Sequence, residues 1–418
     1  MQSRINSYGR LKLACYITNV SMSVVANLAP ILFLGFHDLY NISYALLGLL
    51  VLVNFSTQLI VDLIFSFFSH KFNFSMTLKL TPVLTVIGLA IFALAPVIFP
   101  SAPYVGLVIG TVIYAASGGL GEVLISPVIA AIPADDPDRE VSKLHSVYAW
   151  GVVFVVPLVS FFILFFTINM WQLLVLICSL IPLTASLLFI GTKLPELKTP
   201  ERVSGVIEHL KNPTLILCII AIFLGGASEC TMSQWASSYI EGALGVDKIY
   251  GDIFGVTLFA AMLGLGRTLY TKFGRSPERI LLFGSIGAVI CYLVAALSPN
   301  SIVGLIACAL TGLAASMLWP GTLIAASDRI PTGGVFVYAV MAAGGDLGAS
   351  LGPQMVGAIA DTLSLNTELA ASLSMTPDEL GLRAGILIGA LFPAIAIIFY
   401  AILIKSKSQK LKIFLYNK

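Results

Sequence analysis

The chain has 418 residues, of which 58% are hydrophobic and only 11% are charged, with 23 Lys and Arg residues against 21 Asp and Glu residues. A typical soluble domain is about 45–50% apolar and about 25% charged, so this composition excludes an ordinary soluble enzyme. The high hydrophobicity also excludes a disordered chain, and a net charge of +2 gives no reason to expect a nucleic-acid partner.

Long apolar runs recur at intervals of about 35 residues, which is the length of one membrane-spanning helix of about 20 residues plus a connection. The first run is too long for a signal peptide and no small-residue cleavage site follows it, so we interpret it as a retained span. The sequence therefore predicts an all-α membrane protein with twelve transmembrane helices. These lie at 12–36, 43–69, 77–99, 103–131, 142–168, 171–191, 213–240, 249–271, 278–298, 301–326, 334–361 and 382–404.

The basic residues indicate how these spans are oriented. If both termini are cytoplasmic, all but two of the 23 Lys and Arg residues lie in cytoplasmic connections or tails, and only Lys248 and Arg383 lie outside. Cytoplasmic loops of membrane proteins carry such an excess of Lys and Arg. We therefore expect a multi-pass protein of the cytoplasmic membrane with an even number of spans and both termini in the cytoplasm.

The two halves of the sequence resemble each other. Gly119 and Pro127 in the fourth span recur with the same spacing as Gly312 and Pro320 in the tenth. Duplicated halves are a common plan for transporters, in which the substrate site lies near the bilayer midplane at the interface of the repeats. We predict two pseudo-symmetric six-helix bundles, at 1–195 and 213–418, joined by a cytoplasmic linker at 196–212.

Across essentially its whole length the chain resembles the major facilitator superfamily. Members usually carry the motif G-x-x-x-D-R-x-G-R-[KR] after the second span, and this chain departs from it, with Ser66, His70, Lys71 and Asn73 near the motif positions. The second-half copy, Lys272-Phe273-Gly274-Arg275, is closer to the motif. The resemblance implies gating contacts, which we expect at Asp62, Lys71, Arg267, Lys272 and Arg275.

Four stretches narrow the resemblance to the fucose:proton symporter family and its sugar-transporting relatives. They are GGLGEVLISP in the fourth span, LHSVYAWG in the fifth, the set Glu229, Trp235 and Tyr239 in the seventh, and GGDLGASLGPQMVGAIAD in the eleventh. The family resemblance implies a secondary active transporter that takes up a sugar with a proton. It also places the family's coupling carboxylate at Glu122.

Four acidic residues lie well inside predicted spans: Asp62, Glu122, Glu229 and Asp346. A charge at mid-bilayer costs about 2.5–3.5 kcal/mol on insertion scales, so such residues usually face a partner or a water-filled cavity. Glu122 is the first candidate for proton coupling, since three neighbouring glycines leave it little side-chain cover, and Glu229 and Asp346 are the alternatives. A purely structural Glu122, hydrogen-bonded to a neighbouring helix, is the competing interpretation.

Aromatic and polar residues of several spans are candidates for binding the solute. Trp235 and Tyr239 are four residues apart and share a helical face, where a ring could stack on the C–H face of a sugar, although membrane-interface anchoring or packing would produce the same pattern. The full set of expected solute contacts is Asn19, Asn27, Glu122, His145, Glu229, Gln234, Trp235, Tyr239 and Trp319.

The glycines at 344, 348 and 352 predict close approach of two helices.

The sequence thus favours symport of a small polar, sugar-like solute with a proton. Export of drugs or metabolites by proton antiport, and sodium-coupled sugar symport, remain alternatives on the same fold. A receptor or scaffold is less favoured, and no nucleophile-and-base spacing or metal cluster indicates an enzyme. We expect a monomer in the lipid bilayer that needs no cofactor or metal and binds no nucleic acid.

Overall fold

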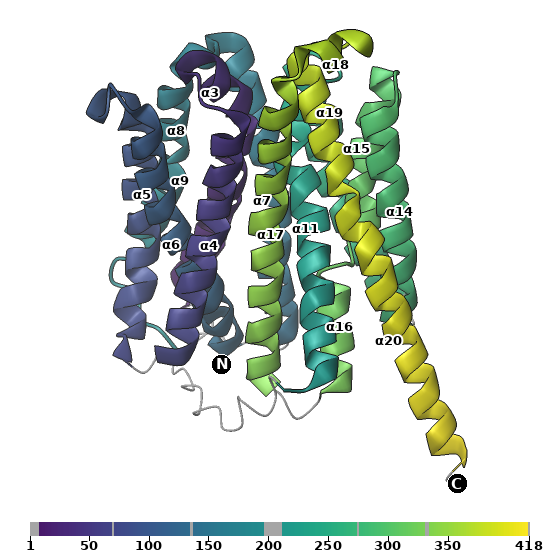
Figure 1. The fold of residues 1–418 in the computed structure, drawn as a ribbon. Helices are drawn as coiled ribbons and strands as arrows, with labels where there is room; N and C mark the ends of the chain where they lie inside the picture. Colours follow the sequence, from purple (N-terminus) through teal and green to yellow (C-terminus); the bar gives the residue numbers. More distant parts are fainter. Residues whose placement is uncertain are drawn as a thin grey trace. The chain divides into compact units, whose positions relative to one another are not determined.

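The computed structural model describes residues 8–68, 71–133, 137–195, 211–273, 276–330 and 334–416 (Figure 1). These residues form helices and turns and include no strand. The chain divides into two compact units, unit 1 (Met1–Arg202) and unit 2 (Val203–Lys418). Most of the predicted linker, residues 196–210, lies outside the described residues.

Unit 1 contains helices at all six positions predicted for its spans. The first and sixth spans are each divided in two. The elements are α2 (Gly9–Ile31), α3 (Phe33–Tyr40), α4 (Tyr44–Phe68), α5 (Phe74–Ile98), α6 (Pro103–Ala131), α7 (Pro137–Phe166), the short 3-10 turn η2 (Ile168–Met170), α8 (Trp171–Cys178) and α9 (Leu180–Phe189).

Unit 2 contains helices at the other six predicted positions. Its eighth span contains a π-helical turn after the first helical turn, and its tenth and twelfth spans are divided. The elements are α11 (Pro213–Gly242), α12 (Lys248–Gly251), η3 (Asp252–Thr257), α13 (Leu258–Phe273), α14 (Pro277–Leu297), α15 (Ser301–Ala315), α16 (Pro320–Arg329), α17 (Gly334–Ser364), α18 (Thr367–Ser372), α19 (Pro377–Gly389) and α20 (Leu391–Tyr416).

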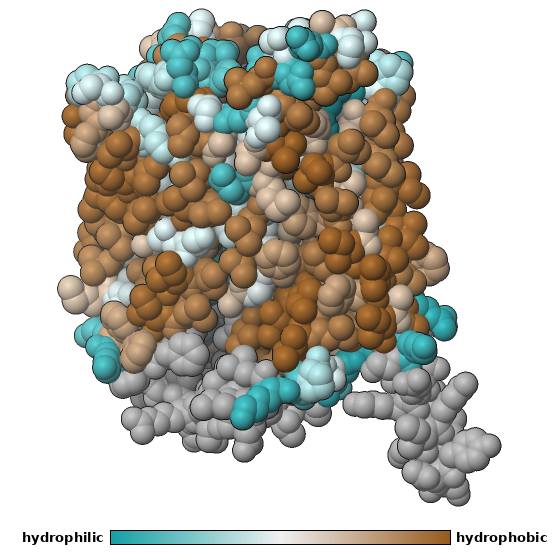
Figure 2. Space-filling view, viewed as in Figure 1, coloured by the Kyte–Doolittle hydropathy of each residue, from teal (hydrophilic) through white to brown (hydrophobic). Residues whose placement is uncertain are grey.

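The predicted all-α membrane fold is confirmed. Ten segments of the described residues are long and apolar enough to cross a membrane, and a shorter apolar helix covers Trp150–Phe166. The remaining predicted span corresponds to α17, a helix of 31 residues. On the face shown in Figure 2, hydrophobic residues cover the middle and hydrophilic residues gather at the two ends, as expected for helices that cross a bilayer.

Proline accounts for three of the helix breaks. Pro182, Pro320 and Pro393 each lack the backbone N–H that would bond to the carbonyl four residues earlier. In each case the preceding helix ends at or next to that earlier residue: α8 at Cys178, α15 at Ala315 and α19 at Gly389. The sequence predicts a continuous span at each of these places because the residues on both sides of the proline are apolar.

In unit 1, α2 and α7 are joined by polar side chains inside the bundle. Asn19 Nδ2 donates a hydrogen bond to the carbonyl of Leu144 at 2.6 Å, and Ser23 Oγ donates to the carbonyl of Tyr148 at 2.8 Å. A Cβ added at Gly151 would clash with Ser23. The serine and asparagine of the first span therefore hold α2 close to α7.

In unit 2, α17 lies beside α11, as Figure 1 shows. A Cβ added at Gly348 would clash with the carbonyl of Phe223, and one at Gly352 with Oγ1 of Thr231. At Gly344 the added Cβ would lie 3.1 Å from Cγ2 of Ile219. The predicted role of the three glycines in close helix packing is confirmed.

The two basic residues that the predicted topology leaves outside are both used within unit 2. Arg383 donates hydrogen bonds from Nη1 to the carbonyls of Ala296 (3.1 Å) and Ser298 (2.9 Å), where α14 ends. A cation at a helix C-terminus is favoured by the helix dipole. Lys248 Nζ lies 3.3 Å from Asp252 Oδ2. Both exceptions to the charge asymmetry therefore have local structural partners.

At the end of unit 1 where α2 begins, Glu140 of α7 binds two lysines. Lys12 and Lys143 each form an ion pair with it, the latter at 2.7 Å. Hydrogen bonds donated by Lys12 and Lys143 lower the pKa of the Glu140 carboxyl to about 2. The ionised carboxylate thus joins α2 to α7 beyond the apolar part of α7.

The α11–α17 contact makes a stability prediction. Gly348→Ala should lower the thermal unfolding temperature of the purified protein, since overpacking a close contact costs about 1–3 kcal/mol. The matched control is Gly264→Ala, because a Cβ at Gly264 meets no atom within 4 Å. That change should be neutral or stabilise helix α13 by up to about 1 kcal/mol. Equal unfolding temperatures for the two variants would contradict the close contact.

The Glu140 contact makes a pH prediction. The pKa of glutamate in an unfolded chain is about 4.3. Because the pKa of Glu140 is lower in the folded state, the contact stabilises the fold fully above the unfolded-state pKa. This stabilisation is lost as the pH falls from there toward 2. The difference in unfolding temperature between wild type and Glu140→Gln should therefore be constant from about pH 7 to about pH 5 and shrink below about pH 4.5. A difference that disappears near neutral pH would refute the assignment.

Candidate functional site

Glu122 of α6 is an exposed carboxylate inside a membrane-spanning helix. No residue that the structure describes forms a hydrogen bond or an ion pair with it. Gly119 and Gly121 pack closely against other helices: an added Cβ would lie 2.7 Å from Asp62 Oδ1 and 2.9 Å from Met22 Sδ, respectively. Since a charged group inside a membrane is costly against lipid, the ionised form of Glu122 requires water or another polar group beside it.

Glu229 of α11 has a different environment, because it is paired with Arg267 of α13. Arg267 Nη2 lies 3.1 Å from Glu229 Oε1 and 3.2 Å from Oε2. The Glu229 side chain is 14% exposed, whereas that of Arg267 is 43% exposed. The positive charge of Arg267 compensates the negative charge of the Glu229 carboxylate.

The backbone of the tenth span positions Arg267. Arg267 Nε donates a hydrogen bond to the carbonyl of Ser316 at 3.1 Å. In a continuous helix that carbonyl would accept from the N–H of residue 320, but residue 320 is proline. The Ser316 carbonyl was not among the predicted site residues, although a proline four residues later in an apolar span was an available signal.

Asp346, the third predicted coupling carboxylate, is buried on α17 and is only 6% exposed. Trp319, just before α16, packs against the glycine that precedes Asp346: a Cβ added at Gly345 would lie 2.6 Å from Trp319 Cζ2, and one at Gly226 would lie 3.0 Å from Cζ3. Trp319 is only partly buried. It therefore keeps ring surface that a solute could contact.

Trp235 and Tyr239 lie inside unit 2, with no exposed surface. Trp235 Nε1 donates to the carbonyl of Pro353 at 2.9 Å, and Tyr239 Oη donates to the carbonyl of Ala295 at 2.5 Å. This arrangement differs from the stacking role that we expected, because both rings are covered and both polar atoms are bonded to backbone. Gln234 is also buried, at 5% exposure.

The other predicted polar contacts fall into two groups. Asn19 is buried and bonds to α7, as described above, whereas Asn27 is half-buried and donates a hydrogen bond within its own helix to the carbonyl of Ser23 at 2.9 Å. The side chain of His145 lies outside the described residues. Asn27 is thus the more accessible of the two asparagines.

The residues predicted for gating are distributed over both units. Asp62 of α4 is half-buried against Gly119 of α6, and Lys71 is exposed, with Nζ 5.2 Å from the centroid of the Phe68 ring. Arg267 belongs to the pair with Glu229 described above. The side chain of Lys272, and Arg275 as a whole, lie outside the described residues.

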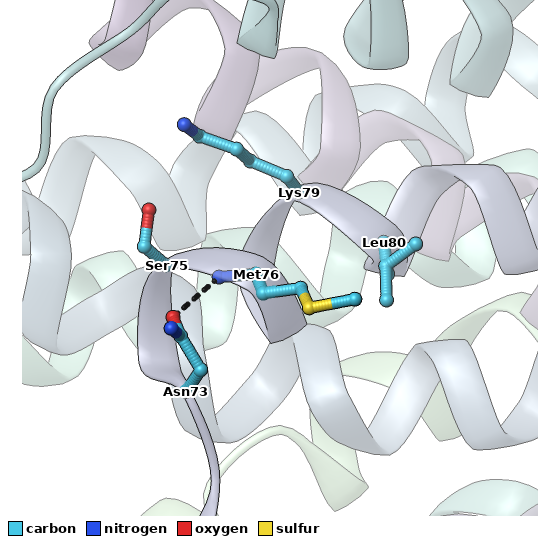
Figure 3. Close-up of a pocket in the computed structure, with 5 residues that line it drawn as sticks. All are labelled: Asn73, Ser75, Met76, Lys79 and Leu80. Atoms are coloured by element: carbon cyan, nitrogen blue, oxygen red, sulfur yellow. Dashed lines mark hydrogen bonds between the residues drawn. The ribbon is translucent and has the colours of Figure 1, made fainter.

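Figure 3 shows a separate, open pocket at the start of α5, lined by Asn73, Ser75, Met76, Lys79 and Leu80. Asn73 Oδ1 accepts a hydrogen bond from the backbone N–H of Met76, which caps the helix. Lys79 Nζ donates to the carbonyl of Thr192 at 3.0 Å. The pocket lies at the end of a span and contains none of the intramembrane carboxylates.

Solved structures with the same fold are membrane transporters. A bacterial homolog of the human lysosomal transporter Spinster has a TM-score of 0.70 at 14% identity, over 96% of this chain and 97% of that chain. A D-xylose-proton symporter has a TM-score of 0.69 at 17% identity, over 93% and 97%. The fucose:proton symporter of E. coli has a TM-score of 0.61 at 16% identity, over 95% and 99%.

The sequence comparison agrees with the fold. The sequence has no significant match among curated proteins. The family model of the Major Facilitator Superfamily matches residues 14–353, which is most of the chain. The protein is therefore a multi-pass integral membrane transporter rather than an enzyme, and it belongs to the Major Facilitator Superfamily.

Proposed function

We propose that the protein takes up a small, polar, sugar-like solute together with a proton, by alternating access, and that Glu122 carries the proton. The observation that carries this proposal is the contrast between two intramembrane carboxylates. Glu122 is exposed and has no hydrogen-bond or ion-pair partner among the described residues, whereas Glu229 is held by Arg267.

An unpaired carboxylate inside a membrane is costly when it is charged and much less costly when it is protonated. Glu122 would therefore release its proton while water reaches it and take up a proton before water is excluded. Glu229 cannot alternate in the same way without leaving the Arg267 charge uncompensated. This difference favours Glu122 over Glu229 as the coupling residue.

One proton per cycle is enough to drive useful accumulation. Moving one charge through 100 mV is worth about 2.3 kcal/mol, which corresponds to roughly 50-fold accumulation at about 1.4 kcal/mol per decade. The polar groups that remain accessible in the described residues, among them Asn27 and Arg267, suit a hydroxylated solute better than a lipophilic one. The xylose and fucose symporters with the same fold are consistent with this class of solute.

The proposed orientation follows the distribution of basic residues. We place the protein in the cytoplasmic membrane as a monomer with both termini in the cytoplasm. The boundaries proposed for the two bundles and their linker, 1–195, 196–212 and 213–418, agree with a six-plus-six arrangement. In the proposed symport, the solute and the proton both move toward the cytoplasm.

Glu122→Gln tests the coupling role, because it removes the titrating group and keeps its shape and hydrogen-bonding capacity. In proteoliposomes the variant should lose accumulation driven by a pH gradient and keep solute counterflow, which needs no net proton movement. The matched control is Glu368→Gln, which makes the same change at an exposed position of α18. It should transport like wild type.

Two results would contradict the coupling role. The Glu122→Gln protein could still concentrate solute in a pH-dependent way, which would place coupling elsewhere. Uptake by the wild type could instead follow a sodium gradient at constant pH, which would make sodium the coupling ion.

Trp235 should act in packing rather than in solute binding. Trp235→Phe keeps most of the ring but removes the hydrogen bond that the indole donates to the carbonyl of Pro353, so the free energy of unfolding should fall by about 1 kcal/mol while solute affinity stays unchanged. Trp150→Phe, at a side chain that is 71% exposed, is the stability control. A folded Trp235→Phe protein that no longer binds solute would show that the indole contacts the solute after all.

A further inference from the structure

We propose that the Glu229–Arg267 pair selects the charge of the solute: it accepts neutral polyhydroxylated molecules and rejects their anionic and cationic counterparts. This inference rests on the proposed function, because it assumes a solute rich in hydroxyl groups. It adds a specificity-determining pair in unit 2, separate from the proton carrier in unit 1.

Arg267 is held by hydrogen bonds to Glu229 and to the Ser316 carbonyl, while the rest of its guanidinium group is accessible. Both carboxylate oxygens of Glu229 lie close to the same nitrogen of Arg267, Nη2, and Nε is bonded to the carbonyl of Ser316. Nη1 forms no hydrogen bond with any residue in the described ranges. With 43% of the Arg267 side chain exposed, its remaining donors are available to a solute.

The arginine cannot easily move away from this position. The Ser316 carbonyl needs a donor because Pro320 supplies none. Gly266, next to Arg267, allows α13 to approach closely, since a Cβ at Gly266 would clash with the side chain of Ser316. The positive charge is therefore anchored at the helix break, and its distance from Glu229 is set by backbone packing.

The pair is neutral overall but offers both kinds of hydrogen-bonding group. The guanidinium provides donors only, and the carboxylate provides acceptors only. A pair of neighbouring sugar hydroxyls can accept from the first and donate to the second. Hydrogen bonds to charged groups are stronger than those between neutral groups, so a neutral polyol gains affinity without bringing a charge out of water.

A charged solute loses this advantage. A carboxylate on the solute is attracted by Arg267 but repelled by Glu229, so the two effects largely cancel, whereas the cost of removing the carboxylate from water remains. For an ammonium group the signs are reversed and the cancellation is the same. Each residue of the pair thus prevents its partner from attracting an ion, which is specificity by rejection of the wrong ligand.

Equilibrium binding to the purified full-length protein, without a pH gradient, tests this inference. The probes are two series that differ in one charged group: glucosamine, glucose and glucuronate, and galactosamine, galactose and galacturonate, at a pH where the amines are protonated. The wild type should bind the neutral member of at least one series about tenfold or more tightly than either charged member.

Single substitutions should change this order in opposite directions. Glu229→Gln leaves Arg267 uncompensated, so affinity for the acid should rise about tenfold relative to the neutral sugar. Arg267→Gln leaves Glu229 uncompensated and should favour the amino sugar by a similar factor. The control is Glu241→Gln, which removes a carboxylate paired with Lys248 at the C-terminal end of the same helix, and it should keep the wild-type order.

Two results would overturn the inference: a wild type that prefers a charged member, or substitutions that leave the ratios between members within about twofold of wild type. If one single variant does not fold, the other still decides, because the predicted shifts are opposite. A wild type that binds none of the six sugars would refute the sugar-like solute itself. Failure of proton-driven uptake in a protein with the predicted binding order would instead refute the coupling proposal alone.

Discussion

The free-energy cost of an unpaired polar group inside a membrane determines much of this structure. Water is absent from the hydrocarbon region, so each backbone carbonyl that lacks its helical hydrogen bond must accept one from another donor. The carbonyl of Ser316, next to the break before Pro320, accepts from Arg267. The carbonyls at the end of α14 accept from Arg383. Arg383 thus bonds to carbonyls at an ordinary helix end, whereas Arg267 bonds to a carbonyl freed by a proline and also belongs to the candidate site.

The same constraint distinguishes the surroundings of the intramembrane carboxylates. Glu229 has a cation beside it, whereas Glu122 has glycine neighbours and no hydrogen-bond or ion-pair partner among the described residues. The proposed mechanism uses both kinds of group: one charge that stays in place to orient the solute, and one that changes with the conformational cycle. The proposed assignment gives the stationary charges to unit 2 and the titrating carboxylate to unit 1.

Much of the fold could be predicted from the sequence because each membrane span requires a long apolar run, which the sequence shows directly. The glycines that let α17 approach α11 were also predictable, since their spacing of four follows the helical repeat. Gly119 and Gly312 occupy equivalent places in the repeat, and each packs against a backbone carbonyl of a neighbouring helix, that of Gln58 or that of Phe259. The repeat in the sequence therefore corresponds to a repeated contact.

The site was harder to predict because side-chain direction depends on packing. Trp235 and Tyr239 share a helical face in the sequence, but that face is covered within unit 2, and both polar atoms bond to carbonyls on other helices. The Glu229–Arg267 pair joins residues 38 positions apart, and no local pattern indicates that contact. Periodicity identifies which residues share a face, but it does not identify what covers that face.

The direction of proton movement during downhill solute entry tests the central claim most directly. Proteoliposomes in a weakly buffered medium, without an imposed gradient, are mixed with the neutral sugar that the protein binds, and the external pH is recorded. Symport through Glu122 predicts that the external medium becomes alkaline as solute enters, and that the Glu122→Gln protein gives no such signal. Acidification of the medium, or solute entry with no pH change in the wild type, would contradict proton symport.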